Sequence, residues 1–68
     1  MSSTIAKKIQ KTAEQGDPDA RFKLGFMYEN GEGVPKNLVL AAQWYQKAAE
    51  QGDTDAQFKL GFMYENGE

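Results

Sequence analysis

The carboxylates are the side chains with the most obvious chemical potential in this sequence, because they recur in spaced pairs. Asp17 and Asp19 stand two residues apart, and Asp53 and Asp55 repeat that spacing. A calcium loop needs several further oxygen ligands and a glycine at its sixth position, which neither pair has. An aspartate at a helix start instead accepts hydrogen bonds from first-turn N–H groups and interacts with the helix dipole. We therefore predict that Asp17 and Asp53 cap helices.

A phosphate loop and an acid–base pair are two further kinds of chemistry to weigh. Gly31-Glu-Gly33 resembles the start of a phosphate loop, but Lys36 stands where a third glycine belongs, and a helical pattern precedes it where a strand is required. Paired catalytic carboxylates need a cleft that perturbs one pKa, and the sequence indicates no cleft. We predict no catalytic residue and no enzyme. The remaining carboxylates are interpreted as solvated charges: Glu14, Glu29, Glu32, Glu50 and Glu65.

Composition limits the classes of function. The chain has 68 residues, a net charge of −2 from eight basic and ten acidic residues, and neither cysteine nor histidine. Disulfides and the usual zinc ligands are therefore excluded. The small basic cluster of Lys7, Lys8 and Lys11 is too weak for nucleic acid. No apolar run is long enough for a membrane span or a signal peptide. We expect no cofactor, no metal, no nucleic acid and no membrane partner, with the cytoplasm as the default location.

An internal repeat is the strongest signal in the chain. AEQGDPDARFKLGFMYENGE over residues 13–32 returns 36 residues later as AEQGDTDAQFKLGFMYENGE over residues 49–68, with differences only at Pro18/Thr54 and Arg21/Gln57. A period of this length is typical of a helical solenoid or array. The near identity of the copies indicates a recent or deliberate duplication.

Two helical patterns make up each copy. Asn37 is suited to cap one of them, Gly52 is suited to end it, and its apolar positions recur at helical spacing. We predict an all-α fold of one domain over 1–68, with two helix-turn-helix repeats over 4–36 and 37–68. The first repeat begins with a capping helix, and the second is truncated at its end. Short connections make neighbouring helices antiparallel. The predicted helices span 4–15, 18–30, 38–51 and 54–66.

Two glycines fall inside predicted helices, where each costs about 1 kcal/mol relative to alanine. Gly25 and Gly61 therefore predict a close crossing by a neighbouring helix. In the first helix, Ile5 and Ile9 are expected to supply core contacts. Trp44 lies between the core face and the polar face of its helix, and we predict that it packs within the fold; the alternative is a direct contact with a partner.

The last helix is predicted to have an uncovered apolar side. Phe58 and Phe62 repeat Phe22 and Phe26, which the following helix should cover, but no helix follows the second copy. Exposed apolar patches usually mark interfaces. We predict self-association as a homo-oligomer through Phe58 and Phe62. The alternative is that the last helix tilts inward and hides both rings.

The sequence resembles the Sel-like repeat family, short relatives of the tetratricopeptide repeats. The motifs that carry the resemblance are GEGVPKN (31–37), AAQWYQKAAEQGD (41–53) and AQFKLGFMYENGE (56–68), together with their first copies, and they cover nearly the whole chain from residue 13. The resemblance implies a right-handed α/α superhelix, an adaptor role and no catalytic or cofactor residue. It also implies that first helices line a concave surface for a protein or peptide, here through Lys7, Gln10, Lys11, Glu14, Gln43, Gln46, Lys47 and Glu50.

These observations predict a non-catalytic protein-interaction scaffold that is a fragment or a minimal unit of a longer array. The near identity of the two copies leaves a second interpretation open, in which the chain is a duplicated or engineered repeat with no natural ligand.

Overall fold

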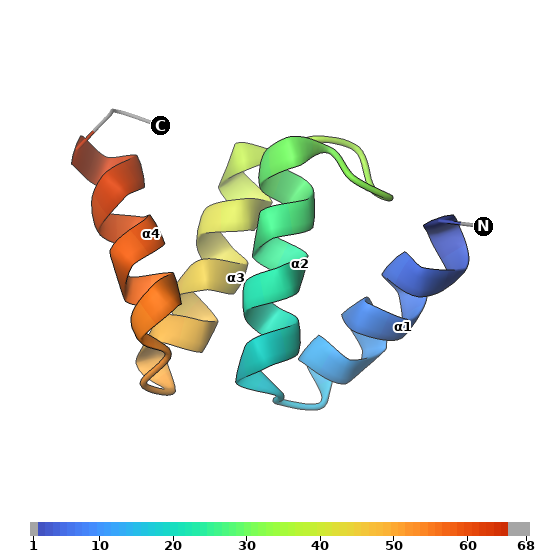
Figure 1. Cartoon of the computed structure of the whole chain (residues 1–68), viewed down its shortest axis with the longest axis horizontal. Coiled ribbons are helices and arrows are strands. Elements are labelled where there is room, and N and C mark those ends of the chain that lie inside the picture. The colour runs from blue at the N-terminus through green and yellow to red at the C-terminus, as the bar shows by residue number, and fades with distance from the viewer. Residues whose placement is uncertain (1, 66–68) are drawn as a thin grey trace.

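The computed structural model describes residues 2–65, and these residues form four helices and no strand. The helices are α1 (Ser2–Glu14), α2 (Pro18–Asn30), α3 (Leu38–Glu50) and α4 (Thr54–Glu65). Each helix packs against the next in the chain, so that α1 and α4 lie at opposite ends of the row (Figure 1). This is the predicted α/α solenoid, and its helix boundaries agree with the sequence to within two residues. The predicted end of the last helix at Asn66 lies outside the described residues.

The predicted caps at the starts of α2, α3 and α4 are confirmed. The Asp17 carboxylate accepts hydrogen bonds from the N–H groups of Asp19, at 2.9 Å, and Ala20, at 3.4 Å. Asn37 accepts from the N–H of Leu40 at 3.0 Å, and Asp53 accepts from the N–H of the residue three positions later at the same distance. Pro18 occupies the first turn of α2, where its missing N–H costs no intrahelical hydrogen bond.

The same tight turn joins α1 to α2 and α3 to α4. Gly16 and Gly52 occupy it with φ values of +105° and +96°, a left-handed conformation that glycine adopts without a Cβ clash. The N–H of Asp17 then bonds to the carbonyl of Thr12, and the N–H of Asp53 bonds to the carbonyl of Ala48. These matched bonds reverse the chain direction within three residues, which makes the neighbouring helices antiparallel.

The core consists of two apolar clusters that meet at Tyr28. The first is centred on Leu24, and the second is centred on Tyr45 and Met63, all of them essentially inaccessible to solvent. Trp44 packs against the first cluster, as predicted. No polar or charged side chain is buried among residues 4–65. The other buried positions are Gly25 and a set of alanines, whose small size lets the helices approach closely: Ala6, Ala13, Ala20, Ala41, Ala48 and Ala56.

The prediction of a close helix crossing holds at Gly25 and is wrong at Gly61. A Cβ atom added to Gly25 would lie 2.7 Å from Cδ1 of Tyr45 and 3.1 Å from the carbonyl oxygen of Ala41, so α3 crosses α2 at this glycine. A Cβ atom added to Gly61 would meet nothing within 4 Å. The difference arises because α3 follows α2, whereas no described helix follows α4.

Two further expectations about burial are corrected. Ile5 was predicted to supply core contacts, yet its side chain is 61% exposed, because no helix precedes α1 among the described residues to cover it. Phe26 was predicted to be covered by the following helix, yet it is 40% exposed. The cation of Lys59 on α4 lies 5.5 Å from the centre of its ring, so the partial cover comes from one helix further along the chain.

Candidate functional site

Tyr45 is the one described residue with a clearly displaced pKa, and its surroundings explain the displacement structurally. Burial, then the hydrogen bond and the charge of Glu29, raise the pKa of Tyr45 far above its ordinary value. Its hydroxyl donates to Oε1 of Glu29 at 2.6 Å, and the same oxygen lies 3.3 Å from Nζ of Lys59. A phenol held neutral in a core and already donating its proton is poorly placed to exchange it with a substrate. We interpret this group as a polar clamp that connects α2, α3 and α4.

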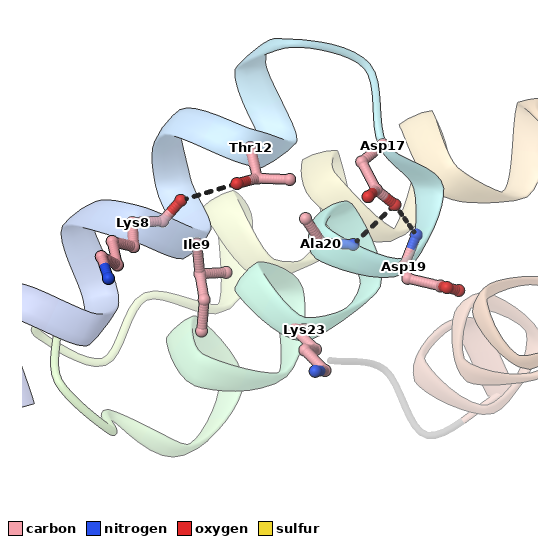
Figure 2. A pocket seen from close by; sticks show the side chains of 7 residues that line it. All are labelled: Lys8, Ile9, Thr12, Asp17, Asp19, Ala20 and Lys23. Carbon is pink, nitrogen blue, oxygen red and sulfur yellow. Dashed lines mark hydrogen bonds between the residues drawn. The ribbon is translucent and has the colours of Figure 1, made fainter.

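The hollow between α1 and α2 contains the carboxylates of Asp17 and Asp19, and helix capping already occupies that of Asp17 (Figure 2). Asp17 there accepts from two backbone N–H groups, and the Thr12 hydroxyl donates to the carbonyl of Lys8. Among the described residues, no group of three or more aspartates and glutamates lies close enough to hold a metal ion. The hollow therefore offers a shaped surface and no set of free ligands.

The predicted partner-binding residues lie on two separate helix faces. All of them are exposed except Gln10, which is half-buried. Within each row a glutamine donates to a glutamate one turn later, Gln10 to Glu14 on α1 and Gln46 to Glu50 on α3, each at 3.4 Å. No hydrogen bond or ion pair joins the α1 row to the α3 row. The α3 row, which comprises Gln43, Gln46, Lys47 and Glu50, lines a shallow depression of its own.

The aromatic side chains at the end of α4 are on the surface. Phe58 is 75% exposed, Phe62 is 50% exposed and Tyr64 is 68% exposed. In this chain α4 thus does not tilt inward far enough to hide the two phenylalanines, which was the alternative to an uncovered end. Phe22, the counterpart of Phe58, packs with its ring centre 5.4 Å from that of Tyr45. The same sequence position therefore packs partly buried against the core in one copy and is exposed in the other.

Two functional features were missed from the sequence. The first is an apolar hollow at the other end of the molecule, lined by Ile9, Phe22, Lys23, Phe26 and Met27 and continued by Ile5. Comparing the first helix with its counterpart 36 residues later would have revealed it, because the positions of Tyr45 and Ala41 in α3 are isoleucines in α1.

The second missed feature is a glutamine that joins the two copies. Gln51 donates to the carbonyl of Gly16 at 2.6 Å, and its amide oxygen accepts from Arg21 at 3.1 Å. Arg21 also donates to the carbonyl of Ala13 at 2.9 Å. A polar residue at a helix end carries no periodic signal, so hydrophobic patterning could not have indicated this contact.

Comparison with known proteins identifies the family. The sequence profile described as Sel1 repeat matches residues 18–53 and 54–68. The chain belongs to the Sel1 repeat family. Sel1 repeat proteins are typically protein–protein interaction scaffolds, and the fold is generally non-catalytic.

Solved structures agree with this assignment. A Sel1 repeat protein from Oxalobacter formigenes is 43% identical and superposes with a TM-score of 0.92 over 96% of this chain and 27% of its own. The protective antigen c5321 of uropathogenic Escherichia coli, which displays an SLR fold, is 40% identical with a TM-score of 0.89, over 93% of this chain and 14% of its own.

A curated relative matches a shorter stretch. The chitin synthase regulator SKT5 of Saccharomyces cerevisiae is 44% identical over 35 residues, which are 52% of this chain and 5% of that protein. This Sel1 repeat chain therefore spans only a small part of the length of each relative. Among its described residues, no helix is long and apolar enough to cross a membrane.

The family match also supplies a repeat frame. It begins at Pro18, so in that frame α2 and α4 are first helices and α3 is a second helix. The sequence pattern instead predicts a division after residue 36, in which α1 and α3 are the first helices. Both divisions describe the same four helices, but they assign the concave surface to different layers, which bears on where a partner would bind.

Proposed function

We propose that this Sel1 repeat chain is a non-catalytic scaffold that binds a protein or peptide through exposed helix faces. The observation that supports it best is the contrast between a core without buried polar side chains and a surface with large exposed apolar groups at α4. Monomeric proteins seldom leave contiguous apolar surface open unless it is used for binding. The interior of the fold therefore serves packing between helices, and its exposed helix faces are available to bind a protein or peptide.

The peptide site that we propose is the pair of polar rows on α1 and α3, with Lys11 and Lys47 as its positive charges. Both rows occupy equivalent places in successive repeats, so a bound segment would meet lysine, glutamine and glutamate at a regular spacing. Lys47 lies 4.9 Å from the centre of the Trp44 ring, which holds its charge over a flat apolar surface. Such a face suits a peptide of mixed charge that lies across both helices.

A displayed library of random peptides tests this site, followed by affinity measurement on the selected sequences. Lys11→Ala and Lys47→Ala should each weaken a selected peptide about threefold to tenfold, because each removes one solvent-exposed ionic contact. Asp19→Ala and Asp55→Ala are the matched controls, since both are exposed on α2 and α4. The reverse result, with losses only in the aspartate variants, would move the binding surface to the layer that contains the first helices of the family frame.

The second part of the proposed function is self-association through the α4 end, where Phe58 is 75% exposed and Phe62 is 50% exposed. Burial of one such ring from water contributes about 1.5–3 kcal/mol. Sedimentation equilibrium over a range of concentrations should therefore show a mass above that of the monomer, and Phe58→Lys should abolish the increase. A monomer at every concentration would refute self-association while leaving the peptide site to its own test.

A further inference from the structure

The contact that α2 makes with the unit of α3 and α4 can be translated along the chain. A shift of 36 residues carries α1 onto α3 and α2 onto α4, with nearly the same sequence. As a result, α4 has on its surface the counterparts of the residues that α2 uses to contact α3. Helices α3 and α4 together form the surface that contacts α2. Helices α1 and α2 together form the corresponding surface at the other end of the row. Among the described residues no further helix lies beyond α1 or beyond α4, which are at opposite ends of the row (Figure 1).

We propose that the α4 end of one copy docks head-to-tail on the α1–α2 end of a second copy, repeating between chains the contact that α2 makes with α3 and α4. This inference rests on the proposed self-association at α4 and specifies its partner surface. Three groups of contacts within the chain show what the junction would contain.

The first group is steric and apolar. Tyr45 and Met63 are at most 1% exposed because α2 covers them, whereas their counterparts Ile9 and Met27 are only half-buried and line the apolar hollow at the α1–α2 end. Gly25 is where α2 lets the Tyr45 ring approach, and its counterpart Gly61 has open space above it. In the junction, Gly61 of one copy receives Ile9 of the next. The branched side chain of Ile9 then fills part of the volume that Tyr45 fills within the chain.

Phe58 is the aromatic residue of α4 that would pack into the apolar hollow of the next copy. Its counterpart Phe22 lies 5.4 Å from Tyr45, centre to centre, so the shift places Phe58 of one copy against Ile9 of the next. This contact would cover a ring that is 75% exposed in the single chain. The hollow thus suits a helix that has a phenylalanine and a glycine three residues apart. Helix α4 has this pair in Phe58 and Gly61.

The second group is ionic. Glu29 and Lys59 form an ion pair at 3.3 Å between α2 and α4. The shift makes Glu65 of one copy and Lys23 of the next their counterparts, and both are exposed in the single chain. The junction thus brings opposite charges together where the template has an ion pair. A contact of two α4 ends would leave Lys23 and the apolar hollow at the α1–α2 end without a partner, so it would not reproduce this ion pair.

The third group is the glutamine contact at the turns. Gln51 donates to the carbonyl of Gly16 and accepts from Arg21. Its counterpart is Gln15, which is exposed, and the shift directs it to the carbonyl of Gly52 and to Gln57 of the preceding copy. Gln57 is already in place for this, because it donates to the carbonyl of Ala49 at 3.1 Å, as Arg21 does to Ala13.

The position of Trp44 in α3, which is a lysine in α1, predicts that the junction between copies is weaker than the contact of α2 with α3 and α4 within the chain. Trp44 packs on the cluster around Leu24, but its counterpart in the first helix is Lys8. The junction therefore lacks its largest aromatic contact, and Leu60 would be covered only by the stem of a lysine. Because the two joined surfaces differ, the contact is heterologous and leaves a free surface of each kind, so assembly continues with increasing concentration and does not stop at a dimer.

A mixing experiment with two blocked variants tests the head-to-tail arrangement. Gly61→Leu blocks the α4 surface without touching the fold, since nothing lies within 4 Å of its Cβ direction, and Ile9→Glu blocks the α1–α2 surface. Each variant alone should be monomeric by sedimentation equilibrium, with helical content checked by circular dichroism. An equimolar mixture should form a closed one-to-one pair. If Ile9→Glu self-associates as the unaltered chain does, the head-to-tail geometry is overturned while self-association at α4 stands.

A charge exchange provides the second test and does not depend on blocking. Glu65→Lys or Lys23→Glu alone should weaken assembly about fivefold, the effect of losing one partly exposed ion pair. The chain with both substitutions should recover assembly, because the pair is restored with reversed polarity. Lys36→Glu is the matched control: it changes the charge equally but has no counterpart at the junction. Equal weakening by all three single variants, with no recovery in the double variant, would refute the proposed pairing.

Discussion

Helices α2 and α4 have almost the same sequence and different surroundings. Leu24 is fully buried and Leu60 is only partly buried, while Phe22 packs on Tyr45 and Phe58 is 75% exposed. At Met27 and Met63 the relation reverses, and the second copy has the buried residue. Burial at these positions is therefore a property of the neighbours that the solenoid supplies and not of the repeat motif. An inner helix has a neighbour on two sides, and a terminal helix has a neighbour on one.

Truncating the paired leucines should give the largest difference between the copies. Leu24→Ala should lower the free energy of unfolding by about 3 kcal/mol, because it leaves a cavity in a closed cluster, and Leu60→Ala should lower it by about 1 kcal/mol. Chemical denaturation followed by circular dichroism measures both. In case Leu24→Ala does not fold, Leu24→Val and Leu60→Val repeat the comparison at smaller amplitude. Equal losses at the two sites would show that the copies are equally buried in solution.

The paired glycines should respond with opposite sign. Gly61→Ala should raise the free energy of unfolding by up to about 1 kcal/mol, since alanine is the better helix former and its Cβ meets nothing. Gly25→Ala should lower it by about 1–2 kcal/mol, because the Cβ would overlap the ring of Tyr45 and force the helices apart. Thermal unfolding at a concentration where the chain is monomeric compares them. Stabilisation by both substitutions would contradict the close crossing at Gly25.

Alkaline pH should lower the free energy of unfolding through Tyr45, which is buried between the inner helices α2 and α3. Burial and the nearby Glu29 raise the pKa of Tyr45 in the folded chain, whereas in the unfolded chain it ionises near its ordinary value of about 10. Above about pH 10 the unfolded state therefore binds fewer protons, and the free energy of unfolding falls by about 1.4 kcal/mol per pH unit.

Tyr45→Phe separates this effect from that of the lysines, which titrate in the same range. The variant should lose about 1 kcal/mol at neutral pH with its hydrogen bond to Glu29, and it should unfold less steeply as the pH rises. Denaturant titrations at several pH values measure the two slopes. Parallel slopes for the variant and the unaltered chain would contradict a buried, neutral Tyr45.

Most of the fold could be predicted because its signals are local. Asp17, Asn37 and Asp53 cap helices through side chains that act within three residues, and glycine turns end the helices at the predicted places. The candidate surfaces were predicted less fully. Exposure of Phe58 followed from counting helices, but the hollow at Ile9 did not, because isoleucine is equally typical of a core position.

The sequence by itself determined that the chain is all-helical, where its helices begin and end, and that its two copies share one pattern, since capping and periodicity act over a few residues. Tertiary structure alone decided which copy of each position is core and which is surface. Gly25 and Gly61, with identical neighbours in the chain, differ because one faces α3 and the other faces open space. The physical reason is that burial is a relation between helices, and identical local sequences cannot encode which helix comes next.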